Sequence, residues 1–285
     1  TTRERIIPAA SQTGSIKDDL TDLIKNKPWL IMLGVTILVF VTLSLKGGMY
    51  IYYFKYYLNP SALSHFLVDI GFVSGIDTLN KVLTSVGLTA FAWPEDAPTS
   101  AFSLFNAGGI ICMIFGIGFS KPLADKFGKR DVFGVFLALS ALCLVAFLFY
   151  GTQSIGIVFL TQLAHGFTYG VTIPLLWAMI ADVADYSELV NNRRATAIIF
   201  SAMIFGLKIG LSLGGAIGAG LLSMYGYVAE SMNQTGDTVQ GILWSVSLYP
   251  GLTLLSAALL LTGYAITKSK EKEIESELKI RRKDA

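Results

Sequence analysis

The amino-acid sequence predicts an all-α membrane protein whose six transmembrane helices form one bundle. Of the 285 residues, 53% are hydrophobic and 15% are charged, whereas about a quarter of the residues are charged in ordinary soluble domains. Six apolar stretches reach the roughly 20 residues with which an α-helix crosses a bilayer. They lie near residues 28–56, 101–120, 131–150, 155–180, 195–222 and 241–266.

The polar segments between these spans differ in their content of lysine and arginine. Eighteen of the 22 basic residues lie in segments 1–27, 121–130, 193–194 and 268–283. The alternate segments contain only Lys81. Because cytoplasmic segments of membrane proteins carry the excess of positive charge, both termini are predicted to be cytoplasmic. The chain has no N-terminal methionine and no signal peptide, which suggests a fragment, a processed product or a trimmed version of a longer chain.

Residues 1–27 are expected to form a cytoplasmic loop with a short helix. Ser15 and Asp18 resemble a capping box, and Ile16, Leu20 and Ile24 recur at helical spacing. This pattern predicts an amphipathic helix on the membrane surface, with an ordinary solvated linker helix as the alternative.

The bundle itself is expected to occupy residues 28–266. The interval 57–100 is long for a connection between spans, and its apolar patches are too short to cross a bilayer. It is therefore predicted to be an extracytoplasmic insert with one or two interfacial helices. Residues 267–285 are predicted to be a charged cytoplasmic tail, a solvated helix supported by the pairs Glu275–Lys279 and Glu277–Arg281.

Lys208 lies in the middle of the fifth span, where a lysine costs roughly 2.5–3.5 kcal/mol to insert. Around it, glycines recur at every fourth residue and predict a face that packs closely on a neighbouring helix: Gly206, Gly210, Gly214 and Gly218. Because Lys208 points away from that face, it is predicted to face a water-filled cavity on a substrate or coupling-ion pathway. The alternative is a buried ion pair that locks helices together. Lys46 lies nearer the end of its span and is expected to lean outward.

The fourth span carries a polar stripe at positions i, i+4 and i+7: His165, Tyr169 and Thr172. Trp177 follows on the same span. Hydroxyl and ring groups of this kind suit sugar recognition, because sugar hydroxyls need hydrogen-bond partners and sugar rings need flat surfaces on which to stack. Hydrogen bonding between helices explains the same residues equally well. In the first and second spans, the main polar candidates are Lys46 and Asn106.

Charged residues gather at the predicted cytoplasmic ends of the spans. The segment KPLADKFGKR, residues 121–130, joins the second and third spans and contains Asp125, Lys129 and Arg130. An acid followed by a glycine and two basic residues resembles the loop signature of the major facilitator superfamily, although Lys121 stands in place of the signature's leading glycine. The fourth span ends in further charges that are predicted to act as a gate or latch: Asp182, Asp185, Glu188, Arg193 and Arg194.

Together these segments resemble one family in particular, the glycoside–pentoside–hexuronide:cation symporters, which are melibiose-permease-like members of the major facilitator superfamily. The matching features are NKPW, LKGGMYIYYFKYYL, KPLADKFGKR and IADVADYSELVNNRRA. The resemblance implies a fold of twelve helices in two bundles, with sugar bound between the bundles and carried by alternating access. On this basis the chain resembles the C-terminal six-helix half.

The resemblance also implies roles for individual residues. Lys208 corresponds to the family lysine beside the sugar and cation sites, and Asp182, Asp185 and Arg194 correspond to the cytoplasmic charged cluster. The family tryptophan that lines the sugar site falls at Ile173, one turn from Trp177. The coupling cation, Na⁺ or H⁺, is expected mainly on the N-terminal half, with no other cofactor and no metal site in this chain.

The predicted function is therefore that of the C-terminal half of a cation-coupled sugar symporter in a bacterial inner membrane. Its expected partners are a sugar or glycoside, the lipid bilayer and the N-terminal half, and nucleic acid is not among them. One alternative is a half-transporter subunit or structural bundle that transports nothing by itself. A membrane-embedded enzyme is disfavoured, because His65 and His165 are far apart and Cys112 and Cys143 lack the spacing of metal ligands.

Overall fold

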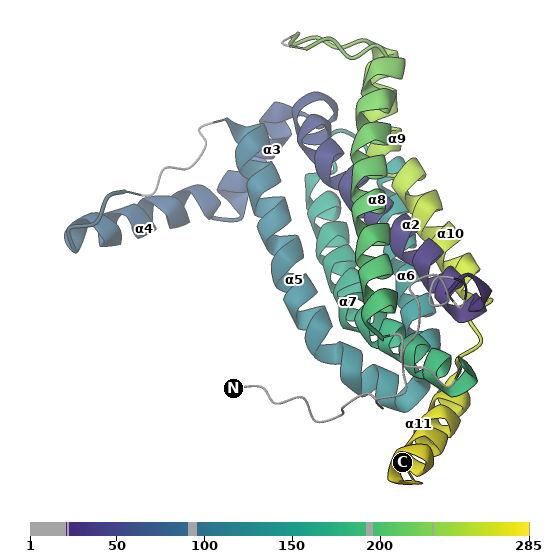
Figure 1. The fold of residues 1–285 in the computed structure, drawn as a ribbon. Coiled ribbons are helices and arrows are strands. Elements are labelled where there is room, and N and C mark those ends of the chain that lie inside the picture. The colour runs from purple at the N-terminus through teal and green to yellow at the C-terminus, as the bar shows by residue number, and fades with distance from the viewer. Residues whose placement is uncertain (1–20, 22, 91–95, 192–195, 230, 285) are drawn as a thin grey trace.

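The computed structural model describes residues 21, 23–90, 96–191, 196–229 and 231–284. Most of the predicted amphipathic helix, together with Arg193 and Arg194, lies outside these residues. Within them, every regular element is helical (Figure 1).

Six helices of the described chain are long and apolar enough to cross a membrane, which confirms the predicted all-α membrane fold. The helices that make these spans are α2 (Lys27–Tyr52), which continues into a π-helical turn (Tyr53–Tyr57), α5 (Ala97–Phe127), α6 (Lys129–Ala146), which continues into a 3₁₀ turn (Phe147–Phe149), α7 (Ile155–Asn191), α8 (Thr196–Met224), and α9 (Gly236–Val246) joined to α10 (Leu248–Leu261). The last predicted span is interrupted at Ser247, three residues before Pro250, which has no N–H to complete the helical hydrogen bonds.

The segment predicted as a loop between the second and third spans is almost entirely helical. Helix α5 continues to Phe127 and α6 begins at Lys129, so Gly128 alone separates them. Gly128 has φ +95°, a conformation that residues with a Cβ rarely adopt. One glycine therefore makes the whole turn.

Helix α7 is longer than predicted and carries the acidic motif on its last turns. Its 37 residues correspond to about 55 Å of helix, whereas the hydrocarbon core of a bilayer is about 30 Å thick. The helix continues past Pro174 to Asn191, so Asp182, Asp185 and Glu188 are helical.

The bundle has two layers of helices. Helix α5 packs on α7, and α2 packs on α8, while α6 and α10 lie behind them and contact α7 and α2 respectively (Figure 1). The end of the bundle that carries Gly128, Asp182 and α11 (Lys268–Asp284) is called the charged end. The opposite end, with α3, α4 and residues 225–229 and 231–235, is called the insert end.

The insert end contains two short helices in the interval 57–100, α3 (Pro60–Asp69) and α4 (Phe72–Ser85), which meet at an angle of 58°. Leu63 and Leu67 bury α3 against the bundle, whereas α4 has no buried residue and extends away from it (Figure 1).

The C-terminal helix α11 is not the solvated tail that its charges predicted. Ile274 and Leu278 are each only 3% exposed and join the hydrophobic core at the charged end, where α11 packs on α7. The predicted pair Glu275–Lys279 is present at 2.8 Å on the outer face. Arg281 donates a hydrogen bond to the carbonyl of Leu189 on α7. Two apolar residues one turn apart thus attach a helix that is otherwise almost entirely polar.

Candidate functional site

The glycines of α8 form the face that contacts α2. A Cβ at Gly210 would lie 2.7 Å from the carbonyl oxygen of Ile37, and one at Gly214 would lie 2.5 Å from that of Val41. Gly206 and Gly218 are likewise buried against side chains of α2. The two backbones approach so closely only because these four residues lack side chains.

Lys208 lies on the opposite side of α8 and is exposed. Within the described part of the chain its ammonium makes no ion pair, so the predicted alternative of a buried, helix-locking pair is not found in this bundle. Its position near the middle of a 29-residue apolar helix leaves a cation on the uncovered surface of a membrane span.

Lys46 is buried, and the expectation that it leans outward is wrong. Its side chain is only 7% exposed, and its Nζ lies 2.7 Å from Nε2 of His165, a residue of α7 that is 1% exposed. The reason is a hydrogen-bond partner in the core that lies 119 residues away in sequence. A buried ammonium that is hydrogen bonded inside the protein does not need contact with water.

The hydrogen bonds around His165 assign its protonation. Nδ1 lies 3.2 Å from the carbonyl oxygen of Ser140, which can only accept, so Nδ1 carries the proton. Nε2 then has a free lone pair and accepts a hydrogen from Lys46. The pair is therefore a cation bound to a neutral imidazole. The hydroxyl groups of Ser140 and Thr168 are hydrogen bonded to each other beside it at 2.9 Å.

Aromatic rings complete the surroundings of the Lys46 ammonium. Its Nζ lies 5.6 Å from the centre of the Tyr50 ring and 5.8 Å from that of Tyr169, within the range of cation–π attraction. The Tyr169 ring also stacks on His165 at 5.9 Å. We call Lys46, His165, Tyr50 and Tyr169 the buried lysine centre.

Three other predicted residues are not part of this centre. The Thr172 hydroxyl is buried and donates to the carbonyl of Tyr169 on its own helix. Asn106 is half-buried on α5, and Trp177 is 36% exposed on α7. No hydrogen bond of the described structure connects Asn106 or Trp177 to Lys46 or His165.

At the charged end, Lys129 joins three helices. Its Nζ lies 2.6 Å and 2.9 Å from the two carboxylate oxygens of Asp182 on α7, and 2.9 Å from Glu271 on α11. Arg130 pairs with Asp131 and donates to the carbonyl of Tyr264. Ion pairs that are partly buried are screened less by salt than fully exposed ones. This three-helix ion pair therefore holds α6, α7 and α11 together.

The other predicted charges at this end have different surroundings. The carboxylate of Asp125 is exposed, and its backbone carbonyl accepts from Lys268 Nζ at 2.5 Å. Asp185 is exposed and Glu188 is half-buried on the last turns of α7. Arg193 and Arg194 lie outside the described residues.

Tyr264 and Glu275 lie beyond the spans at this end, and the pKa of each is shifted. Burial raises the pKa of Tyr264, whose hydroxyl donates to the carbonyl of Met179 at 3.2 Å. A hydrogen bond from Lys279 lowers the pKa of Glu275. Both shifts favour the states present near neutral pH, a protonated phenol and an ionised carboxylate.

Sequence reasoning missed Glu271 and Lys268 at the charged end, and Ser140 and Thr168 beside the buried lysine centre. Glu271 is one of several acids on α11, and nothing in the sequence distinguishes it. The spacing of Ile274 and Leu278 was the available signal that α11 docks.

Comparison with known proteins identifies the family. Residues 97–268 match the family described as MFS/sugar transport protein. The chain belongs to this family. It is 27% identical over 279 residues to the inner membrane symporter YicJ of Escherichia coli K12, a match that covers 98% of this chain and 52% of YicJ.

Other relatives have related names. The glucuronide carrier protein homolog of Escherichia coli K12 is 28% identical over 63% of this chain and 40% of its own length. The isoprimeverose transporter of Lactiplantibacillus pentosus is 24% identical over 95% of this chain and 49% of its own length. These relatives are glycoside and sugar transporters of the major facilitator superfamily rather than enzymes. The chain spans about half the length of the curated relatives that it matches along nearly its whole length.

Proposed function

We propose that this chain is the C-terminal six-helix bundle of a cation-coupled sugar or glycoside symporter. The family match and the relatives about twice its length support this assignment. The distribution of lysine and arginine supports an orientation with the charged end in the cytoplasm and the insert end outside, in a bacterial inner membrane.

The observation that carries the proposal is the position of Lys208. One side of α8 is closed against α2 by glycines, and Lys208 is exposed on the other side of the same apolar helix. Placing a lysine against lipid tails at this depth costs roughly 2.5–3.5 kcal/mol. A second bundle that encloses a water-filled cavity removes this cost. The N-terminal half of a twelve-helix transporter is such a bundle.

In this arrangement the sugar and the coupling cation, Na⁺ or H⁺, bind between the two bundles. Together they stabilise an occluded state that neither stabilises sufficiently alone, and rocking of the bundles then opens the site to the other side. Lys208 tunes the electrostatics of the shared cavity, while acids of the N-terminal half are expected to hold most of the cation site. The three-helix ion pair keeps α6, α7 and α11 together as one moving body.

The test is Lys208→Met in the full-length transporter. Methionine preserves the length of the side chain but removes the charge, so cation-driven sugar uptake is expected to fall at least about tenfold, because intramembrane ionisable residues mark substrate and ion pathways. Uptake of radiolabelled sugar into proteoliposomes under a Na⁺ or H⁺ gradient measures this effect, with protein insertion quantified in parallel.

Lys81→Met is the matched control, because Lys81 is an exposed lysine on α4, far from α8 in sequence and structure. It should leave uptake unchanged. Normal gradient-driven uptake by Lys208→Met would remove Lys208 from the transport pathway and with it the main support for the proposal.

A further inference from the structure

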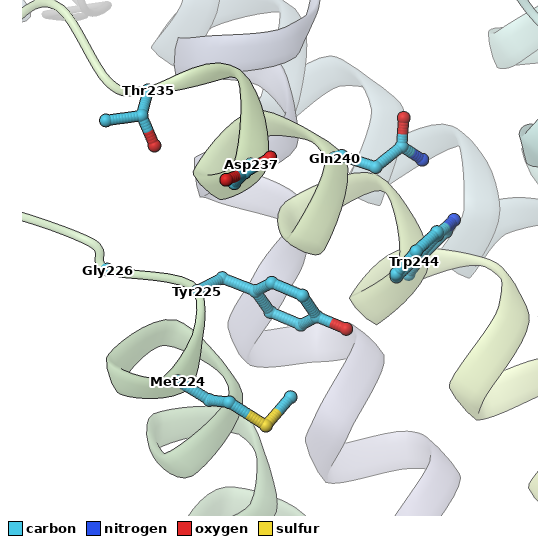
Figure 2. A pocket seen from close by; sticks show the side chains of 7 residues that line it. All are labelled: Met224, Tyr225, Gly226, Thr235, Asp237, Gln240 and Trp244. Carbon is cyan, nitrogen blue, oxygen red and sulfur yellow. The ribbon is translucent and has the colours of Figure 1, made fainter.

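The insert end contains a cavity of about 470 Å³ between the end of α8 and the start of α9 (Figure 2). This volume lies within the range of roughly 300–1,000 Å³ that is usual for small-molecule sites. The side chains around it are Met224, Tyr225, Thr235, Asp237, Gln240 and Trp244. All of them belong to this chain, and none was singled out by the sequence motifs.

The walls of this cavity are fixed by contacts between the two helices. Thr238 donates from its hydroxyl to the carbonyl of Tyr225 at 2.6 Å, which joins the start of α9 to the end of α8. The Tyr225 ring packs so closely on Gly241 that a Cβ there would overlap it. The Tyr225 hydroxyl is hydrogen bonded to that of Tyr249. The cavity is thus formed before any ligand arrives.

The polar groups are arranged along one face of α9. Asp237, Gln240 and Trp244 follow one another at i, i+3 and i+7, with exposed carboxylate and amide groups near an indole ring (Figure 2). The Trp244 and Tyr225 rings meet edge to face, with their centres 5.9 Å apart. A pyranose ring has the complementary chemistry, because its hydroxyls can hydrogen bond to a carboxylate and an amide while its C–H face packs on an aromatic ring.

We propose that this cavity is a binding site for the pyranose ring of a neutral glycoside, separate from the cavity that Lys208 faces. The only charged side chain among the described lining residues is Asp237, which repels an anionic sugar such as a hexuronide. The site rests on the proposed function for the class of its ligand. With the insert end outside the cell, it captures the sugar at the bundle's outer rim.

The experiment measures glycoside binding to the purified chain itself. The chain is placed in lipid nanodiscs, because many detergents are themselves glycosides, and is titrated with methyl β-D-glucopyranoside by saturation-transfer NMR. Binding in the millimolar range is expected. Methyl β-D-glucuronide, which has the same ring with a carboxylate, is expected to bind at least about tenfold more weakly, since like charges repel across a partly desolvated site.

Asp237→Asn is the decisive variant, because the residue is exposed and the change is isosteric. It should weaken binding of the neutral glycoside about tenfold, since it replaces a charge-assisted hydrogen bond with a neutral one. It should also reduce the discrimination against the glucuronide. Asp77→Asn on α4 is the matched control, because it makes the same change at another exposed site of the insert end.

The outcomes separate this site from the proposed transport cavity. Lys208→Met should leave binding to the single chain unchanged, whatever its effect on uptake by the full-length transporter. No detectable binding of the glycoside, or equal binding by Asp237→Asn and the unmodified chain, would overturn the proposal. Displacement of the glycoside by glycerophosphocholine would also overturn it, by identifying the cavity as a lipid-headgroup site at the membrane interface.

Discussion

The surroundings of the two lysines Lys46 and Lys208 make an instructive pair. Lys208 lies near the middle of its helix and is exposed, whereas Lys46 lies nearer the end of its helix and is 7% exposed. Depth along the membrane normal and burial inside the protein are therefore independent properties. A hydropathy profile reports the first and says little about the second.

The difference arises from what each helix face contacts. Glycines direct one side of α8 to α2, which leaves Lys208 on the other side. Lys46 lies on a face of α2 that meets α7, where His165 supplies a neutral acceptor. Lys208 makes no ion pair with a described residue, whereas Lys46 is satisfied within the bundle.

The largest expected effect on stability follows from placing a side chain on the glycine face of α8, where this helix packs on α2. Gly210→Leu, two residues from Lys208, forces a side chain into the backbone of Ile37 and the Cβ of Phe40, only 2.7 and 2.8 Å from a built Cβ. Because neither atom is at the end of a flexible side chain, the α2–α8 contact is expected to open, with a loss of at least about 3 kcal/mol. Thermal unfolding in nanodiscs measures this loss.

Gly220→Leu is the matched control, since a Cβ at Gly220 meets nothing within 4 Å. Its melting temperature should stay close to that of the unmodified protein. Equal stability of the two variants would mean that the glycine face does not set the orientation of Lys208.

The next effect concerns the buried lysine centre. His165→Ala leaves the ammonium of Lys46 without its acceptor in the core, at a cost of about 2–5 kcal/mol. Adding Lys46→Met should restore much of that stability, because the uncompensated charge is removed together with its need for a partner. A double-mutant cycle on the unfolding midpoint gives the coupling energy. Additive losses would show that the two side chains do not depend on each other.

The smallest effect is expected from Lys208→Met. Lys208 makes no ion pair with a described residue, and it faces the membrane whether α8 is packed or unpacked, so the cost of inserting it cancels. Its loss should therefore change the stability of this bundle by less than about 0.5 kcal/mol. The same thermal unfolding experiment measures it beside Lys46→Met. A large destabilisation by Lys208→Met would indicate a structural partner and would abolish the contrast between the two lysines.

The sequence predicts well those features that depend on local pattern. The six spans follow from hydropathy, and the α2–α8 contact face follows from four glycines in one helical register. The companion contact of α5 with α7 is equally close but was not predicted. There Gly109 on α5 faces Gly166 on α7, and Gly170 packs on the backbone of Met113. Helix α7 carries only one step of four residues, Gly166 to Gly170, and Gly109 lies on the other helix, so no segment displays a repeat as long as that of α8.

Features that depend on distant pairing could not be predicted. The contact of Lys46 with His165 needs the packing of α2 on α7, and the ion pair of Lys129 with Asp182 and Glu271 needs three helix ends in one place. The docking of α11 was obscured because its charges outnumber its two buried apolar residues. These interactions join residues that are close in space but far apart in the sequence, whereas a sequence pattern shows only relations between nearby positions.

The single-glycine turn between α5 and α6 has a kinematic consequence. One residue extends the chain by only about 3.8 Å, so the two helices cannot slide past each other and can only pivot about Gly128. The stem of Lys268 packs on this glycine, and its ammonium holds the carbonyls of Asp125 and Lys126. Gly128 is therefore the pivot between α5 and α6, and Lys268 of the C-terminal helix restrains the movement of this pivot.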